Sequence, residues 1–225
     1  VGLGQGQTAE TSTDPNGNVT TKVYDKAGRM VSVTADGQTT SYTYYNNGSK
    51  HMVVYPDGST EEYTYYDDNL LYTLVNKKAD QTVIDSYTYT YDAAHNMASK
   101  VDSKGTTSYT YDDLERLLTV TEPSTQVTSY TYDAAGNRAS QTVALSGNST
   151  VTDYTYNTQN RLTGSLAKLN NVTTQAISYT YDNNGNQLTE TTTPYVNGIP
   201  QTPVTQTFTY DTLNQLITVT ASGSA

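Results

Sequence analysis

The chain has 225 residues, of which 34% are hydrophobic and 15% charged, and its formal net charge is −10 at pH 7. The absence of cysteine excludes thiol nucleophiles, disulfides and thiolate metal sites, and two histidines leave little room for histidine-based metal sites or catalytic triads. The acidic balance argues against a nucleic-acid or anionic-membrane partner. No apolar run approaches the roughly 18 residues of a membrane-spanning helix, and residues 1–10 have no signal-peptide character.

The hydrophobic residues are dominated by tyrosine. Tyr occurs 22 times, against one Phe and no Trp. A chain poor in Leu, Ile and Phe cannot build a thick aliphatic core, so any buried layer must consist largely of tyrosine. Because Thr, Tyr and Val favour strands and helical periodicity is scarce, the composition predicts an all-β protein.

A motif of the form Tyr-Thr-Tyr-Asp-x-x-Gly recurs along the chain. Its second aromatic residue, called here the register tyrosine, is Tyr24, Tyr44, Tyr65, Tyr91, Tyr111, Tyr132, Tyr156, Tyr181 and Tyr210. Successive intervals are 20, 21, 26, 20, 21, 24, 25 and 29 residues. A period of 20–21 residues, lengthened by insertions in the wider gaps, is typical of a repeat architecture.

Each repeat is predicted to contain two short strands and two turns. In residues 31–44, alternating runs flank Asp36-Gly37, which suits a type I′ hairpin turn. Segments 52–65 and 101–111 repeat this pattern with Pro56-Asp57-Gly58 and Lys104-Gly105. The second turn follows the register tyrosine. Four residues after that tyrosine Gly and Asn dominate, as expected where the backbone takes positive φ: Gly28, Gly48, Asn69, Gly136, Asn160, Gly185 and Asn214. His95 and Glu115 are exceptions at this position, and Glu115 is the poorer fit.

The Tyr-Thr-Tyr triplet predicts the faces of the sheet. Residues i and i+2 of a strand lie on one side, so Tyr130 and Tyr132 share a face and Thr131 takes the other. Stacked repeats would form a ladder of tyrosine pairs in which neighbours, rather than a central core, supply stability. The fold class expected is therefore a continuous, spiralling sheet of repeated antiparallel hairpins, similar to a β-solenoid or a shell, with a tyrosine ladder as its core.

The expected organisation is an irregular N-terminal segment at 1–13, a repeat array of about nine units at 14–220, and a C-terminal tail at 221–225. Insertions at 74–85, 163–177 and 191–206 are expected to lengthen loops or strands.

At residues 129–138, SYTYDAAGNR, the sequence resembles the YD-repeat family of Rhs proteins, bacterial wall-associated proteins, the BC components of Tc toxins and the teneurins. The resemblance covers about residues 14–220, since nine units match in register. It implies a spiralling β-sheet that, in long members, closes into a hollow shell around a toxin domain or forms a barrel on a cell-surface receptor.

The sequence departs from the long members of that family. Nine units are fewer than a closed shell needs, and neither a DPxGxxG-rich core-ending motif with its cleaving aspartates nor a following toxin domain has a match. Neither end has a polar cap, so we expect a slice of a longer array or a unit that joins end to end.

Two interpretations exist for the aspartates that follow the register tyrosine, namely Asp25, Asp92, Asp112, Asp133, Asp182 and Asp211. A row of carboxylates could bind calcium or supply an acid–base pair. Alternatively, each carboxylate accepts backbone N–H groups in an Asx turn. Because Tyr45 and Asn157 replace this aspartate in two units, we favour the turn. DPNGN at 14–18 and DNNGN at 182–186 lack the later glutamate of a calcium loop, so they too are predicted to be turns.

Basic residues are also interpreted as structural. Arg29, Arg116, Arg138 and Arg161 follow the glycine turn, where they could pair with turn carboxylates, stack over tyrosine rings or form a thin ligand stripe. His51 and His95 have no nucleophile nearby and are interpreted as repeat variants.

These observations favour a structural, non-catalytic scaffold without cofactor or metal, forming part of a β-sheet shell or stalk of an extracellular or cell-surface protein. The expected partners are further YD repeats, an enclosed toxin or cargo domain, or surface glycans. Two alternatives remain open. One is a self-assembling extracellular filament joined through open strand edges. The other is a glycan-binding adhesin, which the exposed Tyr, Asn and Thr side chains would suit.

Overall fold

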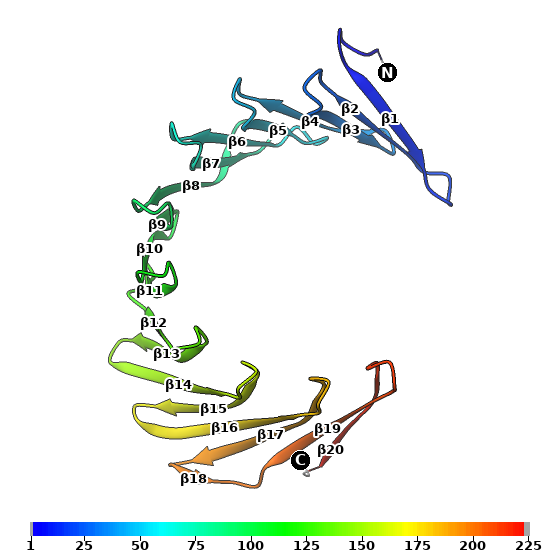
Figure 1. Cartoon of the computed structure of the whole chain (residues 1–225). Coiled ribbons are helices and arrows are strands. Elements are labelled where there is room, and N and C mark those ends of the chain that lie inside the picture. The colour runs from blue at the N-terminus through cyan, green and yellow to red at the C-terminus, as the bar shows by residue number, and fades with distance from the viewer. Residues whose placement is uncertain (1, 223–225) are drawn as a thin grey trace. The chain divides into compact units, whose positions relative to one another are not determined.

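The computed structural model describes residues 2–222, and all of its regular secondary structure in this range is β (Figure 1). The chain divides into two compact units, residues 1–106 and 107–225. The described residues contain no helix that is long and apolar enough to cross a membrane. The predicted all-β, antiparallel fold is confirmed.

Unit 1 contains nine complete strands, each joined to the next by a turn. They are β1 (Thr8–Thr13), β2 (Val19–Tyr24), β3 (Met30–Ala35), β4 (Gln38–Tyr44), β5 (Lys50–Val54), β6 (Thr60–Tyr65), β7 (Leu71–Lys77), β8 (Val83–Tyr91) and β9 (Met97–Asp102). Each strand from β1 to β8 pairs antiparallel with the one that follows it. This order is that of a simple meander.

Unit 2 repeats the meander. Its strands are β10 (Gly105–Tyr111, which begins in unit 1), β11 (Leu117–Thr121), β12 (Val127–Tyr132), β13 (Arg138–Leu145), β14 (Asn148–Tyr156), β15 (Leu162–Leu169), β16 (Val172–Tyr181), β17 (Gln187–Val196), β18 (Ile199–Pro200), β19 (Val204–Tyr210) and β20 (Leu216–Ser222). Pairing is sequential from β10 to β17. Strand β17 then pairs with β19, and β19 with β20, while β18 forms a short hairpin with the end of β17.

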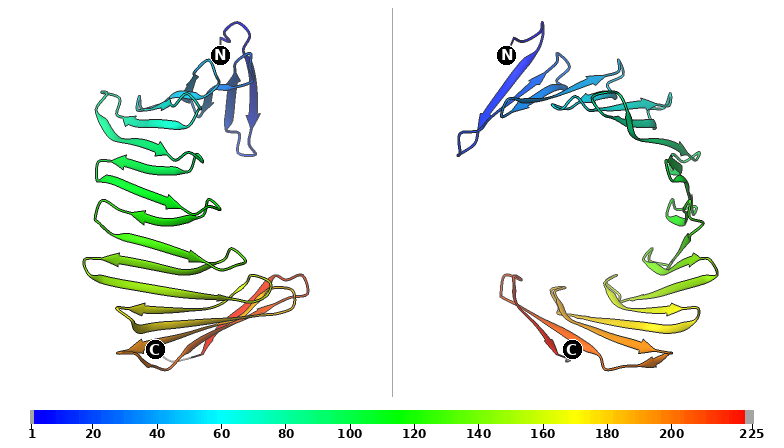
Figure 2. Two further views of the ribbon diagram at one scale, coloured as in Figure 1. Left: turned by 60° about the vertical axis from the view of Figure 1, so that its left-hand side comes forward. Right: turned by 180° about the vertical axis from the view of Figure 1, so that it is seen from behind.

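Within each unit the strands form a single layer (Figure 2). A single layer cannot enclose side chains, and of the hydrophobic residues among 2–222 only Val23 and Val53 are buried. The tyrosines of the Tyr-Thr-Tyr triplets are instead half-buried, in the pattern expected for a shared face: Tyr130 and Tyr132 are half-buried and Thr131 is exposed. Each strand therefore obtains most of its cover from its two neighbours.

The threonine face is linked by hydroxyl groups. Thr or Ser residues that face each other on adjacent strands lie 2.5–2.7 Å apart between their hydroxyl oxygens, in the pairs Thr64–Thr73, Thr90–Ser99, Thr110–Thr119, Thr131–Ser140, Thr180–Thr189 and Thr209–Thr218. Cross-strand pairs of this kind stabilise an antiparallel sheet by a few tenths to about 1 kcal/mol each.

The structure corrects both predicted ends of the array. Residues 8–13, expected to be irregular, form strand β1, because their backbone pairs with β2 from Thr8 opposite Tyr24 to Thr13 opposite Val19. At the other end β20 continues to Ser222, where Ser222 pairs with Thr205, so residues 221 and 222 are strand rather than tail. The remainder of the predicted tail, 223–225, lies outside the described residues.

Two of the three predicted type I′ turns are also different. Asp36 and Gly37 have φ of 52° and 75°, as a type I′ turn requires. Residues 55–59 instead form a five-residue turn in which Gly58 has positive φ but Asp57 does not, whereas a type I′ turn at Asp57-Gly58 requires positive φ at both. In the third, the turn residues are Ser103 and Lys104, and Gly105 opens β10 with φ of 123°.

The insertions mainly lengthen strands. Residues 163–177 extend β15 and β16 around a tight turn at Asn170-Asn171, where φ is 49° and 67°. Residues 191–206 extend β17 and add β18, and residues 74–85 add a turn at 78–82 between β7 and β8.

Candidate functional site: the stack of tyrosines and Asx turns

A five-residue turn follows every register tyrosine. In the first repeat, the N–H of Asp25 donates to the carbonyl of Arg29, and the N–H of Gly28 donates to the carbonyl of Asp25. The equivalent two hydrogen bonds form after each of the other register tyrosines. The fourth position after each register tyrosine has positive φ in all nine repeats, from 59° at Asn160 to 96° at Gly185. His95 (68°) and Glu115 (61°) adopt this conformation too, although it is unfavourable for such side chains.

The aspartates begin these turns. One carboxylate oxygen of Asp25 accepts the N–H groups of Ala27 and Arg29, at 2.9 and 3.0 Å. The same double acceptance occurs at Asp92, Asp112, Asp133 and Asp211, and Asn157 reproduces it with its amide oxygen. Asp182 accepts the N–H of Asn186. The carboxylates therefore act as turn acceptors.

The second carboxylate oxygen binds the side chain at the end of the turn. Arg29 and Arg116 each form an ion pair with their own turn aspartate at 2.7 Å, and Asn96, Asn137 and Asn186 donate amide hydrogens in the equivalent place. The hydrogen bond from the Arg116 side chain holds the pKa of Asp112 below its ordinary value. Amide hydrogen bonds lower the pKa of Asp133 and Asp182 in the same way.

No group of three or more His, Asp or Glu side chains within residues 2–222 is arranged to hold a metal ion. The DPNGN segment forms a turn in which Asp14 accepts the N–H groups of Asn16 and Asn18.

A β-bulge accompanies every register tyrosine. In each of the nine repeats this tyrosine pairs with the residue six positions later, while the residue before it pairs with the one nine positions later, as for Tyr132 with Arg138 and Thr131 with Ser140. One extra residue on one strand increases the local twist. These bulges were not predicted from the sequence, because a bulge can be recognised only when the two paired strands are already aligned.

The register tyrosines connect neighbouring repeats. The Tyr132 hydroxyl donates a 2.7 Å hydrogen bond to the carbonyl of Leu117, which is six residues after the preceding register tyrosine. The same bond joins Tyr44 to Met30, Tyr91 to Leu71, Tyr156 to Arg138, Tyr181 to Leu162 and Tyr210 to Gln187, at 2.7–3.0 Å. Burial raises the pKa of Tyr44, Tyr91 and Tyr156. We call this bond the tyrosine lock.

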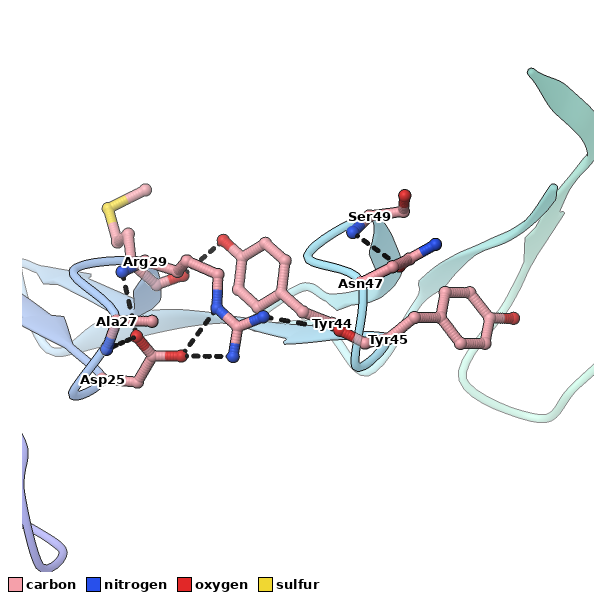
Figure 3. A network of polar contacts seen from close by, with 8 residues as sticks. Asp25, Ala27, Arg29, Tyr44, Tyr45, Asn47 and Ser49 are labelled. Atoms are coloured by element: carbon pink, nitrogen blue, oxygen red, sulfur yellow. Dashed lines mark hydrogen bonds and ion pairs between the residues drawn. The ribbon is translucent and has the colours of Figure 1, made fainter. Parts of the chain in front are cut away.

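Guanidinium groups are interleaved with the tyrosine ladder. Arg29 lies over the ring of Tyr44 in the next repeat at 4.9 Å, and Figure 3 shows it between that ring and Asp25. Arg116 lies over Tyr132 at 4.3 Å and Arg161 over Tyr181 at 5.0 Å. Arg138 instead covers Tyr130 of its own repeat at 4.4 Å. The arginines thus take both predicted structural roles, carboxylate pairing and ring stacking.

Tyrosines replace the turn aspartate in two consecutive repeats. The Tyr45 hydroxyl donates to the Tyr63 carbonyl and that of Tyr66 to the Tyr89 carbonyl, at 3.0 and 2.9 Å. Their rings meet the next register tyrosines edge-on, Tyr45 with Tyr65 at 6.1 Å and Tyr66 with Tyr91 at 6.2 Å.

The two histidines make local contacts in this stretch. His51 packs against Tyr45 with 4.6 Å between ring centroids, and Nε2 of His95 lies 3.6 Å from a carboxylate oxygen of Asp68 in the preceding turn.

The fold and this site define a tandem-repeat β-sheet scaffold. The RHS Repeat family model matches residues 4–39 and 111–147, which confirms the resemblance to RHS, or YD, repeats in these two regions. No curated protein matches the chain in sequence.

Solved structures share the fold. The chain superimposes on the crystal structure of TcdB2-TccC3 without its hypervariable C-terminal region, with a TM-score of 0.68 and 17% identity over 92% of this chain. TcdB2-TccC3 itself gives 0.53 at 18% identity over 89%, and a mutant Photorhabdus luminescens Tc holotoxin pore gives 0.52 at 16% over 88%. The chain spans only 12–14% of the length of these proteins.

Proposed function

We propose that this chain is a structural, non-catalytic segment of wall in an extracellular β-sheet shell or stalk built from RHS repeats. Its task is to hold a sheet of defined width and spacing, so that the number of repeats sets the extent of the wall. Further repeats of the same kind are its direct partners, and a cargo or toxin domain is the content that such a wall would enclose.

The observation that carries this proposal is the tyrosine lock. Each lock joins a side chain of one repeat to the backbone of the preceding one, six times at 2.7–3.0 Å. A recurring bond between neighbours specifies the spacing of the repeats whatever their number, which is the property required of a wall element. The aspartates and the arginines are engaged in the same turns, so the chemistry-bearing side chains of the repeat serve its geometry.

Electron microscopy of this chain produced together with the sequence that flanks it in its gene would test the proposal. We expect hollow particles or stiff rods in which this segment forms wall, and protection of any enclosed domain from added protease until the wall is disrupted. Compact particles in which the segment is dispensable would contradict it. Concentration-dependent fibres of the isolated chain would favour the filament, and glycan binding lost on Tyr-to-Ala substitution would favour the adhesin.

A further inference from the structure

The repeats contain an internal binding site for a guanidinium group. Where the fifth residue after the register tyrosine is arginine, its guanidinium lies over the register ring of the next repeat, at 4.3–5.0 Å. In two of these cases Nη1 also reaches the carbonyl of the residue after that ring: Arg29 to Tyr45 at 3.4 Å and Arg161 to Asp182 at 3.2 Å. The site thus combines an aromatic face with a backbone acceptor.

Six of the nine repeats lack this arginine. In four of them an amide side chain takes its place, at Asn96, Asn137, Asn186 and Gln215, and in two consecutive repeats of unit 1 its place is taken by Ser49 and Leu70. An open hollow lies at each of these last two places. One, of about 470 Å³, is lined by Tyr45, Asn46, Asn47, Thr64, Tyr65, Tyr66 and Asp67. The other, of about 480 Å³, is lined by Tyr66, Asp67, Asp68, Leu70, Thr90, Tyr91, Asp92, Ala93 and His95. These two hollows lie beside the register rings Tyr65 and Tyr91, where the guanidinium group of the preceding repeat would lie.

The hollow at Leu70 keeps the aromatic ring and the backbone acceptor of the guanidinium site, whereas Tyr66 stands in place of the turn aspartate and its ring meets that of Tyr91 edge-on at 6.2 Å. Tyr91 is the register ring, and Asp92 is the residue after it, equivalent to Asp182 at the Arg161 site. The carbonyl of Asp92 accepts the N–H of His95, as that of Asp182 accepts the N–H of Gly185 while it also binds Arg161. A carbonyl oxygen has two lone pairs, so Asp92 retains one for a ligand.

The charge of this hollow favours a cation. Within residues 2–222, the Asp67 carboxylate has no hydrogen-bond or ion-pair partner. Asp68 accepts the N–H of Leu70 and faces His95, the one basic side chain in the lining. The rings of Tyr66 and Tyr91 add the negative faces that attract cations.

We propose that the hollow at Leu70 binds a guanidinium group supplied from outside the chain, either on a free small molecule or on the arginine side chain of a partner peptide. The group stacks on Tyr91, donates to the carbonyl of Asp92 and pairs with Asp67. A guanidinium is favoured over an ammonium because it is planar, stacks on rings and presents its donors as a fork. The proposal concerns a ligand of the scaffold and is independent of whether the wall closes.

Titration of the chain, followed by NMR, tests this site. The probes are N-acetyl-arginine amide, its uncharged isostere N-acetyl-citrulline amide, and a pentapeptide with a central arginine. We expect saturable shifts at Tyr66, Tyr91 and His95 with both arginine probes, and binding of the citrulline probe to be weaker by about tenfold or more, since charge-assisted hydrogen bonds are lost. Tighter binding of the pentapeptide would assign the source to a peptide partner, and equal binding to a free guanidinium compound.

Two variants make the test specific. Leu70→Arg should fill the hollow from within, as Arg161 does at Tyr181, and abolish binding of both arginine probes. Leu213→Arg is the control, because it adds the same charge at a residue of unit 2 that is 74% exposed. Asp67→Asn should weaken binding several-fold without filling the hollow. Equal binding of arginine and citrulline probes, or unchanged binding by Leu70→Arg, would overturn the proposal.

Discussion

Removal of a single tyrosine hydroxyl measures what the lock contributes. In Tyr132→Phe the ring and the stacked Arg116 stay, and only the 2.7 Å bond to the Leu117 carbonyl is lost. A hydrogen bond of this kind contributes about 1 kcal/mol net to stability. For a chain of this length, that loss corresponds to a fall in melting temperature of about 2–4 °C. Urea unfolding followed by circular dichroism gives the free energy directly.

Tyr130→Phe is the matched control for this experiment. Tyr130 lies on the same strand and the same face and is likewise covered by an arginine, Arg138, but its hydroxyl has no hydrogen bond among the described residues. We expect its substitution to change the free energy of unfolding by less than about 0.5 kcal/mol. If the two substitutions cost the same, the lock contributes nothing beyond ring burial, and the argument that repeats are held by this bond is refuted.

Three further predictions concern the turns and the titrating side chains. Glu115→Gly should raise the free energy of unfolding by about 0.5–1 kcal/mol because it relieves a positive φ of 61°, whereas Gly136→Ala should lower it by a similar amount; equal effects in urea unfolding would contradict this. Asp112→Asn, which keeps the Asx turn as Asn157 does but loses the ion pair with Arg116, should destabilise less than Asp112→Ala in thermal unfolding, and the reverse order would be incompatible with turn initiation. Folding lowers the pKa of four turn aspartates, Asp25, Asp112, Asp133 and Asp182. It raises the pKa of the tyrosines Tyr44, Tyr91 and Tyr156, and that of Tyr55 to about 12. The contribution of these groups to the free energy of unfolding should therefore be greatest at pH values between the ordinary carboxyl and phenol pKa values. It should fall as the pH drops through the lowered carboxyl values and as it rises through the raised phenol values, and a melting temperature unchanged across both ranges would exclude these contributions.

The turn explains why one short motif can recur with so much variation. Asp, Asn and Tyr all occupy its first position, and Gly, Asn, His and Glu its fourth, yet the backbone bonds are the same in every repeat. Since these bonds are made by the backbone, substitution changes the strength of a turn rather than its shape. This tolerance leaves room for variants such as Tyr66 and Leu70, where the repeat opens into a hollow.

Several features of this fold could be predicted from the sequence because they depend on interactions between residues close together in the chain. The two-residue alternation of Tyr-Thr-Tyr predicted which side chains share a face, and Gly or Asn four residues after the register tyrosine predicted positive φ there. His95 and Glu115, which were exceptions to that pattern, adopt the same conformation. The Asx turns were equally accessible, because a carboxylate that caps its own turn needs partners only two and four residues away. Where the prediction from sequence was wrong, at β1 the outcome depended on pairing with strand β2, and at residues 55–59 on a backbone hydrogen bond between Tyr55 and Ser59 that closes a longer turn.

The contacts that each side chain makes with the next repeat were determined only by the tertiary structure. The lock ends on a backbone carbonyl, which is the same atom in every residue and so leaves no mark in the sequence. The bulge that presents this carbonyl, and the placing of Arg116 over Tyr132 rather than over a ring of its own repeat, both depend on the alignment of two strands. The hollow at Leu70 is visible only when Arg29, Arg116 and Arg161 are seen to fill the equivalent place, because an absent guanidinium is recognised by the space it leaves.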